Sequence, residues 1–335
     1  MRKLTFLLIA FLTVAFVFLS FSELKSIVET LQQANFWIIL LALFVQLVWL
    51  YNMGLTFRSL YWLVDLKEDS IHLTKVATAA NFINVVAPSL GVGGMAVFVN
   101  DGRERGHPSG KVTAATALFI LFDYAAFLCV LALGIIVLVR RDDLTSGEIS
   151  ASVFLFFIFL GLSFLIFLGM HSAKKLGKAL AWLTRIVNRL ADPLIHRLYL
   201  EEKKAHLFAE EIAEGLVSVR LRPKRLIKPL FFALINKTLL IIVLLLMFTA
   251  FKVPFSAGTI IAGFAIGYLF LIVSVTPSGI GVMESVLALA LTSLGVIWSQ
   301  AVVITLAFRA VTLWFPLGLG ALVFRNLQKE KKSTL

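Results

Sequence analysis

Four ionisable residues lie inside long apolar stretches of this sequence and could do chemistry there. They are Asp123, Lys237, Glu284 and Arg309. A charge at the centre of a membrane helix costs about 3 kcal/mol on insertion scales, so each such residue needs a partner or a water-filled cavity. The guanidinium of Arg309 could attract a phosphate, whereas the carboxylates of Asp123 and Glu284 could attract a cationic group or form a gate with Arg309.

The spacing around two of these charges predicts that they form a pair. Asp123 precedes Gly134 by 11 positions, and Arg309 precedes Gly320 by the same 11. We expect Asp123 and Arg309 to meet across two related spans, either as a structural ion pair or as part of a substrate or gating site. Lys237 lies about a third of the way into its own apolar run, where it could snorkel toward the interface.

Two Pro/Gly-rich motifs interrupt the apolar stretches 76–99 and 259–294. Proline lacks a backbone donor and clustered glycines weaken a helix. Within a membrane, irregular backbone survives only where it is buried in protein or lines a wet cavity. We therefore predict two broken, re-entrant helix pairs, with tight helix packing as the alternative. The polar breaks contain Asn84, Pro88, Ser89, Gly91, Gly93 and Gly94 in the first pair, and Thr276, Pro277, Ser278, Gly279 and Gly281 in the second.

Glu284 follows the second break near the start of a half-helix. The positive end of the helix dipole stabilises a carboxylate at this place and could also attract a phosphate.

The composition places all of these features in a membrane protein. Of the 335 residues, 60% are hydrophobic and 15% are charged, 30 are Phe, and the mean hydropathy is +0.95. A soluble protein of this size could not bury so much apolar surface. The net charge of +12 indicates cytoplasmic loops and anionic lipid, and we expect no nucleic-acid partner.

The cysteine and histidine content disfavours a metal or redox enzyme. Cys129 is the single cysteine, which excludes disulfides within the chain and Cys-based zinc or iron–sulfur sites. The five histidines include no pair at a spacing of three or four. We expect no metal, no cofactor and no catalytic residues.

Six apolar runs are long enough to cross a bilayer, at about 4–21, 36–57, 112–139, 149–170, 226–251 and 301–324. The positive-inside rule then predicts a multi-pass plasma-membrane protein with both termini in the cytoplasm. The first run is either an uncleaved anchor or a cleaved signal peptide.

The basic stretch 174–228 joins the fourth and fifth runs. Its first part predicts an amphipathic helix, which either lies on the anionic cytoplasmic leaflet or packs on other loops. A second helical pattern covers about 201–219.

Two parts of the chain, 35–139 and 226–325, share the same order of elements. Each begins with a span, continues with a broken helix pair and ends with a second span. A single crossing within the linking segment 140–225 would invert the second unit relative to the first. Inverted repeats with broken helices are typical of alternating-access transporters. We predict one all-α integral membrane domain with an anchor span and outer loop at 1–34 and a basic tail at 326–335; an oligomer is possible.

The motifs resemble a known family. Asn84-Val85-Val86-Ala87-Pro88-Ser89 with Gly93-Gly94, Thr276-Pro277-Ser278-Gly279-Ile280-Gly281-Val282-Met283-Glu284 and the late Arg309 resemble the transmembrane region of lysylphosphatidylglycerol synthases, also called flippase-like domain proteins. The second motif departs from the family pattern T-P-G-G-[IL]-G-x-x-E in having Ser278. Apolar residues also surround Asp123, where the family often has an Arg.

The resemblance implies a membrane domain that moves lipids between leaflets. In the best-known members this domain precedes a soluble aminoacyltransferase domain. Because the chain ends at Leu335, soon after the last span, we expect it to lack lysyl transfer from tRNA.

Two functions remain open from the sequence. The first is a lipid translocase with a polar midplane cavity; no Walker A motif occurs, so transport would be passive or ion-coupled. The second is a membrane-embedded transferase, for instance a glycosyltransferase acting on a lipid-linked substrate, which would need water-exposed carboxylates such as Asp101 and Glu104. Beside Arg103 and Arg105, those two residues are more simply interpreted as a solvated turn.

Overall fold

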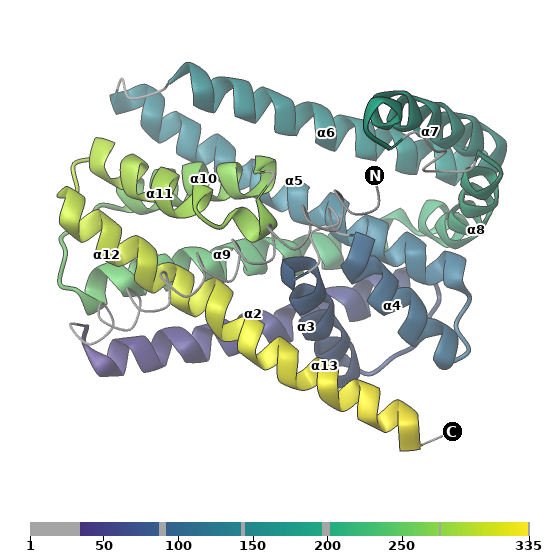
Figure 1. Ribbon diagram of the computed structural model, residues 1–335, viewed down its shortest axis with the longest axis horizontal. Helices are drawn as coiled ribbons and strands as arrows, with labels where there is room; N and C mark the ends of the chain where they lie inside the picture. The colour runs from purple at the N-terminus through teal and green to yellow at the C-terminus, as the bar shows by residue number, and fades with distance from the viewer. Residues whose placement is uncertain (1–33, 87–91, 142–144, 196–201, 275, 334–335) are drawn as a thin grey trace.

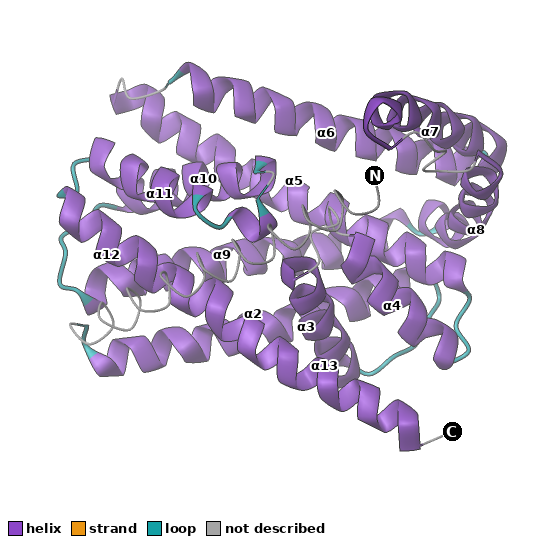
Figure 2. Cartoon of the chain, in the orientation of Figure 1, coloured by secondary structure: helices purple, strands orange, loops and turns teal. Residues whose placement is uncertain are grey.

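A computed structural model describes residues 34–86, 92–141, 145–195, 202–274 and 276–333 of the chain. Within these residues every element is helical and none is a strand (Figure 2), which confirms the predicted all-α class. The elements are α2 (Phe36–Leu63), α3 (Ser70–Val86), α4 (Val92–Glu104), α5 (Ser109–Arg141), α6 (Ser146–His171), α7 (Ala173–Ile195), α8 (Glu202–Leu221), η1 (Pro223–Leu226), α9 (Ile227–Ala250), α10 (Ala257–Val273), η2 (Pro277–Gly279), α11 (Val282–Ser293), α12 (Trp298–Arg309), η3 (Ala310–Trp314) and α13 (Phe315–Ser333).

Five helical segments in the described part of the chain are long and apolar enough to cross a membrane. Each of them overlaps one predicted span, whereas the predicted run at 4–21 lies outside the described residues. The segments are Phe36–Leu63, Ser109–Arg141, Ser146–His171, Pro223–Ala250 and Trp298–Asn326.

The surface of α6 illustrates why lipid is the solvent. Phe154, Phe157 and Phe164 are each more than half exposed on this helix. Water would disfavour so large an apolar surface, whereas acyl chains accept it. The chain is a polytopic membrane protein.

The first spans of the two units, α2 and α9, pack side by side and run antiparallel (Figure 1). The backbone N–H of Asn35, just before α2, donates to the carbonyl of Ala250 at the end of α9 over 3.0 Å. Near the middle, Asn52 Nδ2 donates to Asn236 Oδ1 over 2.8 Å. Corresponding helices that run in opposite directions are what an inverted repeat requires.

The backbone turns in the same way at corresponding places of the two units. Asp65 after α2 and Lys252 after α9 both have positive φ, of 58° and 55°. Gly106 after α4 and Gly295 after α11 also share positive φ, of 75° and 92°. These paired turns extend the repeat through the broken helix pairs.

The last span of each unit packs on the first half of the other unit's broken pair. α5 lies against α10, and α13 lies against α3. At these two contacts a Cβ added to Gly134 would come within 2.5 Å of Ala265 Cβ, and one added to Gly320 within 2.7 Å of Phe82 Cβ. The two close contacts thus fall at corresponding glycines, as the predicted inverted repeat requires.

The amphipathic helix predicted in the basic stretch is α7. Leu176 and Ala181 on its apolar face are buried, and α7 packs on α6 and α8, while Lys174 and Lys178 are exposed. The part of its apolar face described here, at Leu176 and Ala181, therefore packs on other helices of the protein. The other predicted helix is α8, which packs against α5.

The elements that carry most of the described basic residues lie at one end of the bundle. That end holds the α2–α3 loop, the α4–α5 turn, and α7, α8 and η1, on the right of Figure 1. The opposite end holds the α5–α6, α9–α10 and α11–α12 connections.

Candidate functional site

A cavity of about 210 Å³ lies among α2, α3, α4 and α5, with one residue from α10. Polar groups enter it from three helices of the first unit: Asn81 and Asn84 from α3, Thr116 and Asp123 from α5, and Gly94 from α4. We call this the Asp123 cavity. Its remaining wall is mainly apolar and aromatic.

The aromatic wall of the Asp123 cavity is built by stacked rings. Phe57 of α2 stacks on Phe98 of α4 and on Phe119 of α5, with ring centroids 4.0 and 4.4 Å apart. Trp49 also lines the cavity, and its buried indole N–H has no hydrogen-bond partner among the residues that the structure describes. Rigid aromatic walls with a few polar groups are typical of a ligand pocket.

Asp123 pairs with Lys237 of α9. The Asp123 Oδ1 to Lys237 Nζ distance is 2.7 Å, and Lys237 Nζ also donates to the hydroxyl of Tyr268 over 2.7 Å. The Lys237 side chain is 2% exposed and that of Asp123 is 21% exposed. The carboxylate thus reaches the cavity while its cationic partner is sealed behind it.

Two predictions for these charges are wrong. Asp123 does not pair with Arg309, because α5 packs on α9 and α10 whereas α12 packs on α11 and α9. Lys237 does not snorkel toward the interface, because its ammonium lies in the interior where Asp123 and Tyr268 hold it.

Arg309 instead holds the second break. Its Nε donates to the carboxylate of Glu284, and its terminal nitrogens contact the Ser278 carbonyl at 2.9 Å and the Met283 sulfur at 3.5 Å. Glu284 lies in the first turn of α11, as predicted. Directly after Arg309 the helix widens into the π-helical turn η3, a local feature that often accompanies functional sites.

The second break is a tight turn between α10 and α11. Pro277, Ser278 and Gly279 form η2, and Ser278, Gly279 and Gly281 have positive φ. Thr276 bonds through its hydroxyl to the hydroxyl of Ser274 over 2.8 Å. The predicted interruption of the helix is confirmed here.

The first break is closed by a side chain. Asn84 Oδ1 at the end of α3 accepts a hydrogen bond from the backbone N–H of Gly94 over 2.7 Å. Gly94 lies in the first turn of α4, where backbone N–H groups lack helical partners. Gly93 stands beside it in that turn, whereas the predicted break residues Pro88, Ser89 and Gly91 lie outside the described residues.

The two broken pairs meet inside the bundle. Val85 at the end of α3, Ile280 beside η2 and Leu313 of η3 are all buried and form one apolar cluster. α3 packs directly on η2. The end of α3 therefore lies next to the second break.

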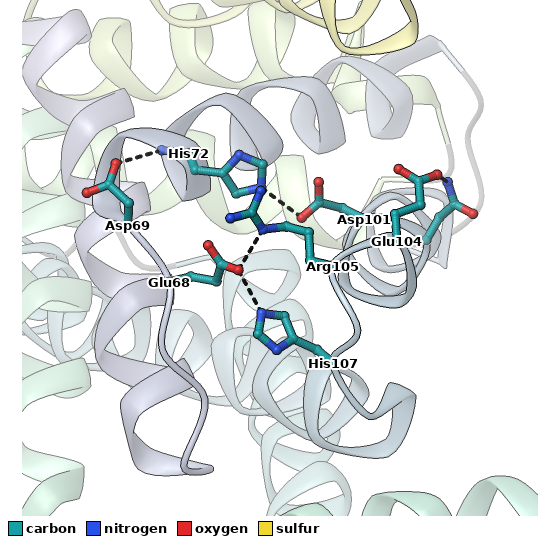
Figure 3. Close-up of polar contacts among 8 residues, drawn as sticks. Glu68, Asp69, His72, Asp101, Glu104, Arg105 and His107 are labelled. Atoms are coloured by element: carbon teal, nitrogen blue, oxygen red, sulfur yellow. Dashed lines mark hydrogen bonds and ion pairs between the residues drawn. The ribbon is translucent and has the colours of Figure 1, made fainter. Parts of the chain in front are cut away.

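Charged residues clamp the outer ends of α3 and α4 together (Figure 3). His72 Nε2 lies 3.0 Å from Asp101 Oδ2, and Glu68 Oε1 accepts from Arg105 Nε over 2.6 Å and lies 2.7 Å from His107 Nε2. The sequence interpretation of this region as a solvated turn is thus wrong for Asp101, whose side chain is 15% exposed.

We call the contacts among Glu68, His72, Asp101, Arg105 and His107 the clamp. They shift the pKa values of the Glu68 carboxyl and the Arg105 guanidinium. Burial by itself would raise the pKa of Glu68, but hydrogen bonds from Arg105 and His107 outweigh it and hold that pKa below its ordinary value. The hydrogen bond to Glu68 raises the pKa of Arg105 in turn. Both groups stay charged at neutral pH. Among the described residues no group of three His, Cys, Asp or Glu side chains is placed to hold a metal ion.

A comparison with models of known protein families shows to which family this chain belongs. The family described as the lysylphosphatidylglycerol synthase TM region matches residues 4–320. The chain belongs to this family. No curated protein and no solved structure matched the chain. Members of the lysylphosphatidylglycerol synthase TM family share a membrane domain that is associated with flippase-like function.

The departure of this chain from the family motif has a structural consequence. Ser278 stands where the resemblance leads us to expect Gly, and its φ of 50° is left-handed. Glycine adopts that conformation without steric cost, whereas a residue with a Cβ does not. Ser278 therefore carries backbone strain that a glycine would relieve.

Several cavity residues were missed by the sequence analysis. Asn81 lies one helical turn before Asn84, so its polar type at that spacing was a usable signal. Thr116, Trp49 and Tyr268 gave no such signal, because a single Thr, Trp or Tyr in an apolar run is most often a packing residue. Only the packing of α2 and α10 around α5 brings Trp49 and Tyr268 to Asp123, whereas Thr116 lies on α5 itself.

Proposed function

We propose that this chain is a lipid translocase in which the Asp123 cavity receives the polar headgroup of a phospholipid. The observation that carries the proposal is a partly exposed carboxylate facing a cavity inside an apolar bundle. Intramembrane ionisable residues are rare and mark substrate or ion pathways. The inverted repeat, with the end of α3 next to the second break, supports the same class of protein.

The size of the cavity supports a headgroup as its occupant. Pockets that enclose a drug-sized ligand have volumes of roughly 300–1,000 Å³. A cavity of about 210 Å³ is smaller and could take a headgroup but not two acyl chains. The chains would remain in the surrounding lipid.

The chemistry of the cavity supports a headgroup with a cationic part. Asp123 would attract an ammonium group, and the amides of Asn81 and Asn84 would donate to a phosphate or hydroxyl. Lys237 would serve as the partner of Asp123 when no headgroup is bound. A headgroup ammonium would then compete with Lys237 for the same carboxylate.

The ion pair between Arg309 and Glu284 would control the position of the second break. Arg309 joins Glu284 of α11 to the carbonyl of Ser278, so it ties α12 to the turn between α10 and α11. Loosening these contacts would let the second broken pair move relative to α3. We assign Arg309 a positioning role and Asp123 a binding role.

The test is a leaflet-exchange assay with labelled phospholipids in proteoliposomes. Wild type should speed exchange over protein-free liposomes, and Asp123→Asn should lower the rate about tenfold or more, because it removes the charge that binds the headgroup. Asp123→Asn also leaves Lys237 buried without a counter-charge, so a second variant is needed.

The double variant Asp123→Asn/Lys237→Met removes both charges and restores neutrality. We expect it to be better folded than Asp123→Asn by thermal unfolding and still to exchange lipid slowly. Wild-type exchange by the double variant would show that the pair is only structural and would overturn the assignment of this cavity. No exchange by wild type with amine-bearing or amine-free lipids would overturn translocation itself.

The contacts of Asp101 and Glu104 do not support a membrane-embedded transferase. Asp101, one of the carboxylates it would use, is paired with His72, and Glu104 accepts a hydrogen bond from Asn100 over 2.9 Å. We therefore do not propose it.

A further inference from the structure

A second cavity, of about 450 Å³, lies at the basic end of the α2/α9 pair. Arg58 of α2, Lys67 of the α2–α3 loop and Lys228 of α9 line it, beside the apolar side chains of Trp62 and Phe232. We call it the basic pocket. It shares no lining residue with the Asp123 cavity.

Two carboxylates close in sequence to the lining residue Lys67 are already engaged by other cations. Asp65 pairs with Arg222 at 2.5 Å and with Arg225 at 3.7 Å. Glu68, which lines the pocket, is held by the Arg105 and His107 of the clamp in Figure 3. These acids do not neutralise the cations of the pocket.

Arg58, Lys67 and Lys228 are exposed, and none of them forms an ion pair with a residue in the described parts of the chain. Three cations around one cavity repel each other unless an anion lies between them. A phosphate suits this arrangement, because arginine binds it through two parallel hydrogen bonds and lysine as a point charge.

An apolar strip connects the basic pocket to the membrane-spanning part of α2. Val48, Tyr51, Leu55, Arg58 and Trp62 follow one another at spacings of three and four, so they share one face of the helix. Val48, Tyr51 and Trp62 are 38%, 45% and 45% exposed. The face passes from apolar side chains at mid-span to a cation and an aromatic ring at the end.

Two cationic side chains hold Trp62, which lines the pocket. The guanidinium carbon of Arg225 lies 3.8 Å from the centroid of its ring, and Lys228 Nζ lies 5.9 Å from it. Cation–π contacts of this kind fix an exposed aromatic ring. Tryptophan at a helix end prefers the level of the lipid headgroups.

We propose that the basic pocket binds the phosphate of an anionic membrane lipid, with an acyl chain lying along Val48, Tyr51 and Leu55. The strip favours a lipid over a free phosphate, because a soluble anion would gain nothing from an apolar face that continues into the span. Basic pockets between membrane helices bind anionic headgroups by this charge pattern. The site does not depend on the translocation proposed above.

The experiment measures lipid binding to the detergent-solubilised full chain by native mass spectrometry. The probes are phosphatidylglycerol, phosphatidylcholine and soluble glycerol phosphate. Arg58→Gln/Lys228→Gln removes two cations of the pocket, and Arg220→Gln/Lys224→Gln removes two exposed cations at the same end but outside it. The two double variants change the net charge equally.

Wild type should retain phosphatidylglycerol in preference to phosphatidylcholine. Arg58→Gln/Lys228→Gln should weaken phosphatidylglycerol binding about tenfold or more, as the loss of one or two charge-assisted hydrogen bonds implies, whereas the control variant should bind like wild type. Matching thermal unfolding of the variants would establish that the fold is intact, as expected for exposed side chains.

Three results would overturn the proposal. Equal losses in both double variants would indicate attraction by the whole basic end rather than by a pocket. Unchanged binding in Arg58→Gln/Lys228→Gln would remove the pocket from lipid binding. Displacement of phosphatidylglycerol by glycerol phosphate at a similar concentration would identify a site for a soluble phosphate.

Discussion

At the scale of single residues, the charges of this protein act in pairs that the fold separates into two places. Asp123 and Lys237 join the two units beside a cavity, whereas Arg309 and Glu284 hold one break. A buried ion pair is costly to break because one charge is left unpaired. Each pair therefore fixes a local geometry, and only the first of the two carboxylates lines the Asp123 cavity.

Ser278 and Gly279 give a test of the second break. Ser278→Gly should stabilise the protein by up to about 1 kcal/mol, because it removes the cost of a Cβ at a φ of 50° while adding unfolded-state entropy. Gly279→Ala should destabilise it by about 1–2 kcal/mol or more, since its φ is 66° and the new Cβ would lie 2.7 Å from Leu271 Cδ1. Thermal unfolding in detergent measures both, and a stabilising Gly279→Ala would contradict the turn described here.

Glu68 should make stability depend on pH. Its pKa is lower in the folded protein than its ordinary value of 4.5, so its contribution is complete above that value and is lost as the pH falls through the lowered pKa. Thermal unfolding between pH 7 and pH 3 should reveal this loss, and Glu68→Gln should cost about 1–3 kcal/mol at pH 7 and flatten the profile below pH 4.5. An equally steep acid loss in Glu68→Gln would assign it to other groups.

At the scale of helices, corresponding elements of the two units make corresponding contacts. α5 approaches α10 at Gly134, and α13 approaches α3 at Gly320. The exchange of partners between units ties each broken pair to a span from the other half.

Two glycines on α13 provide a matched test of this contact. Gly320→Leu should lower the unfolding temperature strongly, because its Cβ would lie 2.7 Å from Phe82 Cβ and 2.9 Å from the Thr78 carbonyl. Gly318→Leu, two residues earlier on the same helix, has open space around it and should behave like wild type. If both variants unfold at the same temperature, the close approach of α13 and α3 is not as described.

At the scale of the whole molecule, charge is distributed unequally between the two ends of the bundle. The α7–η1 region and the α2–α3 and α4–α5 connections put most of the described basic residues at one end (Figure 1). The positive-inside rule would place this end in the cytoplasm. The same end carries the basic pocket and the clamp between α3 and α4.

Cysteine labelling tests this orientation. In a Cys129→Ser background, Arg220→Cys should react with an impermeant maleimide from the cytoplasmic face, and Ser146→Cys from the opposite face. Both positions are exposed; Arg220 is in the last turn of α8 and Ser146 is the first residue of α6. Reaction of both from one face would contradict a crossing by α6, and a reversed pattern would contradict the orientation.

The sequence by itself indicated that lipid surrounds the protein, where the spans lie and that two parts of the chain share one order of elements. Apolar runs long enough to cross a bilayer leave helices as the stable choice, because every backbone group must bond within its own segment. The Pro/Gly motif at 277–281 breaks a helix wherever it stands. Gly134 and Gly320 could be matched from the sequence because a close contact between helices requires a small residue, and glycine is recognisable in the sequence.

Only the tertiary structure decided which charges meet and which polar groups share a cavity. Spacing along the chain placed Asp123 and Arg309 at corresponding positions, but it carried no information on the neighbours of α5 and α12. Lys237 and Tyr268 reach Asp123 because α9 and α10 of the second unit pack against α5. Side-chain partners depend on how helices pack across the repeat, and that packing arises from the combined burial of many apolar residues rather than from any local motif.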